Sequence, residues 1–282
     1  MSQLRVSAIS FLNTAPLMWD FEHGGLGRNF DISYTIPSEC AAALAGGQAD
    51  IGIIPAITYA QIPSLVILPN IAIAAKDSVR SILLISKKPI EDVRTVATDN
   101  SSRTSVALTQ ILFAKFLGGH REFTPHRPDL KEMLKKHDAA LLIGDSALQI
   151  SMHDTSYHLY DLAHHWRRLT GKPFVFAFWA VRLDALHRQS KQINLIGTFQ
   201  QSRDHGLLPE NIGALAAEWA PKLGITEAEV TAYLTQNIHY FLDPENHAGL
   251  QLFLTYAREV GLIETVPELR FLGPAAFGST RK

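Results

Sequence analysis

Short apolar runs alternate with helix-like segments along most of the chain, and this alternation limits the possible folds more than any other feature. Such an order is typical of a mainly parallel sheet whose faces are covered by helices. We therefore expect an α/β fold. The candidate strands are residues 5–10, 31–36, 50–54, 66–68, 71–75, 81–86, 95–98, 139–143 and 174–181. Helices are expected at residues 37–44, 102–116 and 161–170.

The alternation is interrupted by Lys87-Lys88-Pro89 and then starts again, which indicates two α/β units. Residues 86–90 would connect the first unit to the second, and residues 171–181 would return the chain to the first. Two crossings between two units form a hinge beside a ligand cleft. The predicted lobes are residues 1–87 with 178–282, and residues 88–177.

The sequence after Asp184 is almost wholly helical. Between Thr226 and Phe241 the apolar residues recur at intervals of three and four, as they do on the buried face of a helix. We expect these C-terminal helices to pack on the first lobe.

Composition excludes several classes of protein. The 26 lysines and arginines balance 27 acidic residues, so the chain has no charge excess suited to nucleic acid or an anionic membrane. No apolar stretch approaches the roughly 20 residues that a membrane-spanning helix needs. The single cysteine, Cys40, excludes an intrachain disulfide, and the N-terminus lacks the apolar run of a secretory signal. We expect a cytoplasmic protein, and the sequence does not predict its oligomeric state.

Ligands of open α/β sheets bind at the carboxyl ends of the strands, where loops and helix N-termini meet. The ligand site is therefore expected among the segments that follow the predicted strands. These segments are residues 11–15, 37–38 (where Ser38 opens a helix), 55–56, 100–104 and 144–146.

Residues 99–105, Asp-Asn-Ser-Ser-Arg-Thr-Ser, form the most informative of these segments. Unpaired N–H groups in the first turn of a helix favour an anion, and Arg103 could add a bidentate grip on a carboxylate. Ser101, Ser102 and Thr104 would supply hydroxyl donors. The alternative is that Ser101 or Ser102 caps the helix and that Arg103 is a solvated surface residue.

Four further residues are candidates because of their place at strand ends. Asn13 offers both an acceptor and donors for orienting a ligand, although it could equally be a turn residue. Ser81 opens a strand beside the hinge. Gly144 permits close approach of its backbone to a ligand, while for Asp145 the pattern favours capping of the next helix over a ligand contact.

No motif for metal or phosphate chemistry is present. His153, His158, His164 and His165 lack the spacing of zinc ligands, so we expect no metal site. The phosphate-loop and serine-hydrolase motifs are absent. Cys40 lies in the alanine-rich stretch Cys-Ala-Ala-Ala-Leu-Ala-Gly, which favours a buried packing residue over a nucleophile.

Several of these strings together resemble the chorismate dehydratase family of the futalosine route to menaquinone. They are SFLNTAPL, IPSECAAALAGGQADIGIIP, DNSSRTSVALTQIL, LLIGDSAL and WRRLTGKPFVFAFWA. The resemblance spans residues 4 to 185 and implies a type II periplasmic-binding-protein fold. It implies dehydration of chorismate to 3-[(1-carboxyvinyl)oxy]benzoate without metal or cofactor. It also implies a catalytic role for Asn13 and cleft positions for Ser81, Ser101, Ser102, Arg103, Thr104, Gly144 and Asp145.

Two other functions stay open from the sequence. A related branch of the family, the cyclic dehypoxanthinyl futalosine lyases, typically begins with a segment like SPCPNDTF, which Phe-Leu-Asn-Thr-Ala-Pro-Leu does not match. The same architecture could also serve a non-catalytic protein that binds a small carboxylate. For the dehydratase, no histidine or glutamate is expected in the loops at strand ends, apart from Glu39 next to Ser38. We therefore expect a substrate-assisted elimination of the E1cB type.

Overall fold

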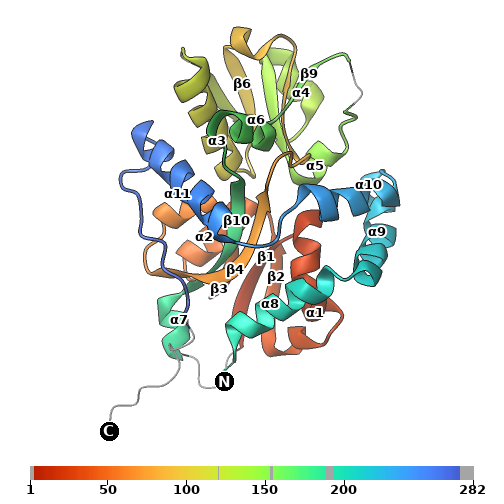
Figure 1. The fold of residues 1–282 in the computed structure, drawn as a ribbon, viewed down its shortest axis with the longest axis vertical. Coiled ribbons are helices and arrows are strands. Elements are labelled where there is room, and N and C mark those ends of the chain that lie inside the picture. The colour runs from red at the N-terminus through yellow and green to blue at the C-terminus, as the bar shows by residue number, and fades with distance from the viewer. Residues whose placement is uncertain (1–2, 120, 153–154, 189–192, 274–282) are drawn as a thin grey trace.

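A computed structural model describes residues 3–119, 121–152, 155–188 and 193–273, and it contains two five-stranded sheets. Figure 1 shows one sheet in the lower half of the molecule and the other in the upper half. The predicted α/β fold is confirmed. No helix in the described ranges is long and apolar enough to cross a membrane.

The first sheet has the strand order β2-β1-β3-β10-β4. Its strands are β1 (Leu4–Ile9), β2 (Phe30–Thr35), β3 (Ile51–Pro55), β4 (Leu65–Ala75) and β10 (Phe174–Arg182). The strands β1, β2 and β3 are parallel, and β10 runs antiparallel to β3 and β4. The two runs expected at residues 66–68 and 71–75 form one strand, bent at Asn70 with a φ of 59°.

The second sheet has the strand order β7-β6-β8-β5-β9. Its strands are β5 (Ile82–Ser86), β6 (Thr95–Asp99), β7 (Glu122–His126), β8 (Ala139–Ile143) and β9 (His158–Asp161). Here β6, β7 and β8 are parallel, and β5 runs antiparallel to β8 and β9. Each sheet thus combines a parallel group with an antiparallel strand that follows a crossing.

The first crossing lies earlier than the sequence analysis placed it. The chain leaves the first sheet at Ala75 and enters the second at Ile82, so residues 76–81 form the crossing and residues 86–90 do not. Every residue of β5 is buried, and a run that is apolar on both faces fits the middle of either sheet. The apolar pattern alone therefore could not assign β5 to its sheet. The division into two lobes stays a prediction, with its first boundary better placed at this crossing.

Helices cover both sheets. They are α1 (Trp19–Glu22), α2 (Pro37–Ala45), α3 (Thr104–Leu112), α4 (Leu130–Lys136), α5 (Gly144–Leu148), α6 (Leu162–Thr170), α7 (Leu183–Arg188), α8 (Leu195–Gly206), α9 (Pro209–Leu223), α10 (Glu227–Ala232) and α11 (Pro244–Glu259). The 3₁₀ helices are η1 (Leu12–Met18), η2 (Leu26–Asn29), η3 (Ala56–Ala60) and η4 (Ile90–Asp92). The described residues also form two π-helical turns, η5 (Phe113–Leu117) and η6 (Tyr233–Asn237).

Two of the C-terminal helices pack on the first sheet, whereas α10, within residues 226–241, packs mainly on α9. Helix α8 lies against β4 and η1, and α11 lies against β10, with its upper end beside α3 of the second sheet (Figure 1). One continuous apolar core includes buried side chains of both sheets, among them Ile54 and Leu141. The two sheets therefore share packing, and the site between them has walls of both.

Candidate active site

A pocket lies between the two sheets, at the edge where the parallel strands of each sheet end. Its cavity volume is about 50 Å³, within about 430 Å³ of space between the walls that includes open solvent. It is lined by Ile9, Phe11, Asn13, Pro37, Pro55, Ile73, Ile82, Ser102, Arg103, Thr104, Ser105, Ile143, Gly144, Phe176 and Ala177. These residues come from the ends of β1, β3, β4 and β8, the starts of β5 and β10, and the N-termini of α2 and α3. This is the edge to which the sequence pointed.

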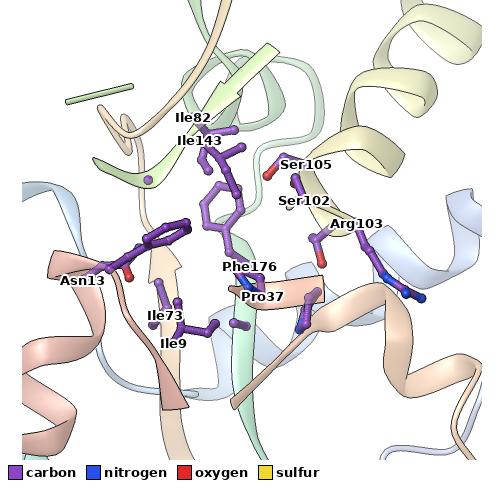
Figure 2. Close-up of a pocket in the computed structure, with 15 residues that line it drawn as sticks. Ile9, Asn13, Pro37, Ile73, Ile82, Ser102, Arg103, Ser105, Ile143 and Phe176 are labelled. Atoms are coloured by element: carbon purple, nitrogen blue, oxygen red, sulfur yellow. The ribbon is translucent and has the colours of Figure 1, made fainter. Parts of the chain in front are cut away.

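The wall on the second sheet has a polar part and an apolar part. The apolar part is Ile82 and Ile143, and the polar part is formed by the last residues before α3 and by the first turn of that helix, where Ser102 and Ser105 lie close together in Figure 2. The first helical hydrogen bond runs from the Ala107 N–H to the Arg103 carbonyl, so the preceding N–H groups of the turn have no acceptor within the helix. Free N–H groups beside two hydroxyls make this wall a good place for a carboxylate.

Neither Ser101 nor Ser102 caps helix α3. The N-terminal capping position of α3 is Arg103, and its side chain makes no capping hydrogen bond. The Ser101 hydroxyl and N–H both donate to the Asp99 carboxylate, at 2.6 and 2.9 Å, which fixes the loop before the helix. The buried hydroxyl of Ser102 is left to face the pocket.

Arg103 is the one charged residue of the lining, yet its side chain is exposed. Figure 2 shows its guanidinium extending away from the other labelled residues. Arg103 also lines a second hollow on the far side of the α3 N-terminus, together with Gln61 and Gln110. The conformation matches the surface alternative of the sequence analysis, and a grip on a carboxylate in the pocket would require the side chain to turn.

The wall on the first sheet is mostly apolar and carries one amide. Phe11 and Asn13 come from the segment directly after β1, at the start of η1, and Phe176 comes from β10; Figure 2 shows Asn13 and Phe176 among the lining side chains. Asn13 is half-buried, and its side-chain oxygen Oδ1 accepts a long hydrogen bond of 3.4 Å from the Thr14 hydroxyl. The hydroxyl of Tyr233 interacts with the Asn13 side chain, and burial raises the pKa of that phenol well above its usual value.

Of the residues expected at the site, Asn13, Ser102, Arg103, Thr104 and Gly144 line the pocket. Four others lie behind its walls: Ser38, Ser81, Ser101 and Asp145. The Ser38 N–H donates to the Ser101 carbonyl at 3.1 Å. Buried Ser81 accepts a hydrogen bond of 2.8 Å from Tyr233 through its hydroxyl, and its carbonyl accepts the Gly144 N–H.

Asp145 does not cap a helix, which corrects the role that the sequence favoured. Helix α5 already begins at Gly144, so Asp145 lies inside the first turn and not before it. Its carboxylate accepts the N–H of Leu12, in η1 of the other wall, at 3.0 Å. Burial raises the pKa of Asp145 to about 6, and the Leu12 hydrogen bond opposes that rise.

Gly144 is required by a close contact between the two walls. Its φ of 57° is in the left-handed region, and a Cβ built there would lie 2.6 Å from the Phe11 ring. The aromatic ring therefore packs directly on the Gly144 backbone. From the sequence we expected a ligand to approach the Gly144 backbone closely; in the structure the group that does so is the Phe11 ring.

Side chains that could act as acids or bases are missing from the described lining of the pocket. It contains no aspartate, glutamate, histidine, lysine, cysteine or tyrosine. Glu39 is exposed and lies outside the lining. Cys40 is buried, as predicted, and burial raises the pKa of its thiol to about 12. The pocket can donate hydrogen bonds and exclude water, but its described lining has no side chain that commonly acts as a general acid or base.

The described residues hold no group of three or more histidine, cysteine, aspartate or glutamate side chains able to hold a metal ion. Among the histidines considered from sequence, His164 pairs with Asp77 at 2.9 Å and His165 stacks edge-on to Tyr160. His153 lies outside the described residues.

Phe176 and Tyr233 also shape the site and were not expected from the sequence. Phe11 and Ser105 lie inside the segments 11–15 and 99–105 that were singled out, although neither was named as a candidate. Phe176 alternates with its neighbours along β10, which would have placed it on one face. Tyr233 comes from η6, far along the chain, and no local pattern could have brought it to Ser81 and Asn13.

The fold and the pocket define a two-sheet ligand-binding architecture of the periplasmic-binding-protein type. A crystal structure of a protein from Archaeoglobus fulgidus has a TM-score of 0.72 at 17% identity, covering 93% of this chain and 98% of that one. The periplasmic aliphatic sulphonate binding protein of Escherichia coli has a TM-score of 0.68 at 15% identity, covering 100% and 96%. At such identities the likeness concerns the fold alone.

The chain belongs to the menaquinone biosynthesis family, whose model matches residues 4–259. It is 27% identical to a chorismate dehydratase of Thermus thermophilus over 259 residues, 86% of this chain and 91% of the relative. It is 28% identical to a chorismate dehydratase of Campylobacter jejuni over 186 residues, 64% of this chain and 69% of the relative. The family match includes every residue of the pocket lining.

Proposed function

We propose that this protein is a chorismate dehydratase, which removes water from chorismate to give 3-[(1-carboxyvinyl)oxy]benzoate in menaquinone biosynthesis. The observation that carries the proposal is the match to the Thermus thermophilus dehydratase over 86% of the chain. The pocket supports it, because hydroxyls and helix N–H groups lie beside apolar side chains between the two sheets. We also propose that the protein works in the cytoplasm, as its sequence predicts.

The chemistry of the substrate explains why a site without acids and bases would suffice. The C3 proton of chorismate is vinylogous to the ring carboxylate, so the carbanion formed at C3 delocalises into that carboxylate. Hydroxide then leaves from C4, takes up the abstracted proton as water, and the ring becomes aromatic. The protein needs to hold one conformation, exclude water and stabilise the developing charge.

The second-sheet wall would bind the ring carboxylate, where negative charge accumulates. Ser102, Ser105 and the first N–H groups of α3 offer donors there. Hydrogen bonds to charged groups contribute roughly 1.5–3 kcal/mol each. Arg103 would turn inward to complete this contact.

The substrate's own enolpyruvyl carboxylate would accept the C3 proton, because the pocket lining offers no side-chain base. Glu39 lies two residues after the lining residue Pro37, and it is exposed. We expect Glu39→Gln to retain turnover. Loss of turnover in this variant, with binding of chorismate preserved, would identify a protein base and exclude the substrate-assisted step.

Asn13 would hold the leaving hydroxyl or the enolpyruvyl side chain from the opposite wall. Its amide carries both donors and an acceptor. Phe11 and Phe176 flank it with apolar surface, which keeps bulk water from the carbanion.

The direct test is to mix the purified protein with chorismate and to follow the diene absorbance and the mass of the product. We expect the diene to disappear and an aromatic product lighter by one water to form. Tight binding without turnover would favour a non-catalytic carboxylate-binding protein. Turnover of a cyclic futalosine in place of chorismate would assign the chain to the cyclic dehypoxanthinyl futalosine lyase-type branch.

A further inference from the structure

Three hydrogen bonds around the pocket join its two walls, and they share one form. In each, a backbone N–H at the start of a helix or helical turn on the first sheet donates to an oxygen on the second. The Leu12 N–H of η1 binds the Asp145 carboxylate at 3.0 Å. The Ser38 N–H of α2 binds the Ser101 carbonyl at 3.1 Å, and the Ile57 N–H of η3 binds the Thr104 hydroxyl at 3.3 Å.

Asp145 differs from the other two acceptors in its charge and in what it holds. It is a carboxylate, so its hydrogen bond is charge-assisted. Its donor, Leu12, immediately precedes Asn13. Phe11, on the other side of Leu12, packs its ring on the Gly144 backbone. Two consecutive residues of α5 therefore contact Phe11, which directly precedes η1, and Leu12, its first residue, and the next residue carries the amide that faces the pocket.

The Asn13 side chain also interacts with Tyr233. The Tyr233 ring is buried, and its hydroxyl donates to Ser81 at 2.8 Å and interacts with the Asn13 side chain. Ser81 in turn accepts the Gly144 N–H through its carbonyl at 2.8 Å. Backbone and side chain of the Asn13 segment are thus both tied to the segment that contains Gly144 and Asp145.

We infer that Asp145 is a positioning residue that couples closure of the pocket to the orientation of the Asn13 amide. With the two walls together, the carboxylate captures the Leu12 N–H and fixes the first turn of η1. With the walls apart, that turn loses its acceptor, and Asn13 loses its alignment. The inference rests on the proposed dehydratase function, in which Asn13 contacts the substrate.

A direct contact between Asp145 and the substrate is the competing reading, and the geometry disfavours it. Asp145 is not part of the pocket lining, whereas its neighbour Gly144 is. Its carboxylate is already engaged by Leu12 in the opposite wall. A second negative charge facing a dicarboxylate would also repel it.

The test compares Asp145→Ala, Asp145→Asn and a matched control, Asp129→Ala. Asp129 also uses its carboxylate to accept a backbone N–H, that of Glu132 at 3.1 Å, at the start of the exposed helix α4. We expect Asp145→Ala to lower kcat by about 10- to 100-fold with KM changed less than about threefold, because misplaced catalytic groups mainly slow the chemical step. Asp145→Asn, whose side-chain oxygen still accepts the Leu12 N–H, should recover most of kcat. Asp129→Ala should match the wild type.

A second measurement does not depend on turnover. Hydrogen–deuterium exchange of residues 11–18 should speed up in Asp145→Ala and stay near the wild-type rate in Asp145→Asn and Asp129→Ala. A higher KM with unchanged kcat would assign Asp145 to substrate binding and overturn the inference, as would unchanged kcat and exchange in Asp145→Ala. If the wild type does not dehydrate chorismate, the proposed function fails, and faster exchange of residues 11–18 still identifies the contact between the walls.

Discussion

The two walls of the pocket differ in how the chain builds them. The polar part of the second-sheet wall is the start of one helix, where Ser102, Thr104, Ser105 and free N–H groups come from one short segment, while Ile82 and Ile143 add apolar surface. The first-sheet wall gathers apolar side chains from several strands around a single amide, Asn13. A local segment is enough to bind an anion, whereas orienting a leaving group and excluding water require parts far apart in the sequence. The difference predicts that the walls contribute to different kinetic constants.

Substitution of the amide should have the largest effect. Asn13→Ala is expected to lower kcat by about 100-fold or more, because loss of one donor to developing charge costs about 10²–10³ in rate. KM should change little, since the carboxylate wall is intact. Steady-state kinetics with chorismate measure both constants. If only KM changed, Asn13 would contribute to substrate binding, as the carboxylate-binding wall does, and the two walls would not differ in the kinetic constant they affect.

The pH dependence of stability tests the contact between the walls. Because burial raises the pKa of Asp145 to about 6, the folded protein binds a proton there more tightly than the unfolded chain does. The stability that this proton contributes is present below about pH 4 and is lost as the pH rises through 6, up to about 3 kcal/mol. We therefore expect Asp145→Asn to gain stability relative to the wild type as the pH rises from 4 to 7. Urea unfolding at several pH values measures the difference, and a constant difference would show that the carboxyl is not desolvated.

Arg103 tests whether the polar wall rearranges around its ligand. If the guanidinium turns inward onto a desolvated carboxylate, Arg103→Ala should raise KM by about 30-fold, or ~2 kcal/mol, with kcat nearly unchanged. Arg127→Ala, also on the second-sheet side but outside the pocket lining, is the control. Wild-type kinetics in Arg103→Ala would leave carboxylate binding to the serines and the helix N–H groups.

The contact of Phe11 with Gly144 should give the smallest effect. Gly144→Ala and Gly171→Ala both place a side chain at positive φ, at 57° and 68°, which costs about 1–2 kcal/mol. Only the former meets a neighbour, since a Cβ at Gly171 has nothing within 4 Å. We expect Gly144→Ala to be the less stable by about 1 kcal/mol and also to lose activity. Equal unfolding free energies and full activity would show that the walls do not need this close approach.

The same contrast between walls explains what could be predicted from the sequence. The polar wall was readable because residues 99–105 combine a strand end, hydroxyls and a helix start in one stretch. The α/β fold and the edge of the sheets that holds the pocket followed from alternation and strand ends.

Long-range pairings were beyond reach for physical reasons. The run of β5 is buried on both faces, so its pattern fits either sheet. Asp145 precedes helical residues as a cap would, and only the fold shows that Leu12 lies opposite its carboxylate. Tyr233 reaches the site from η6, where helical periodicity records its burial but not its partner.

The most direct test of the account is a crystal structure of the protein with 3-[(1-carboxyvinyl)oxy]benzoate bound. We predict that the ring carboxylate accepts hydrogen bonds from Ser102, Ser105 or the N–H groups at the start of α3, with the Asn13 amide beside the carbon that lost the hydroxyl. A product molecule seated outside this pocket, for example in the hollow beside Gln61 and Gln110, would contradict the account.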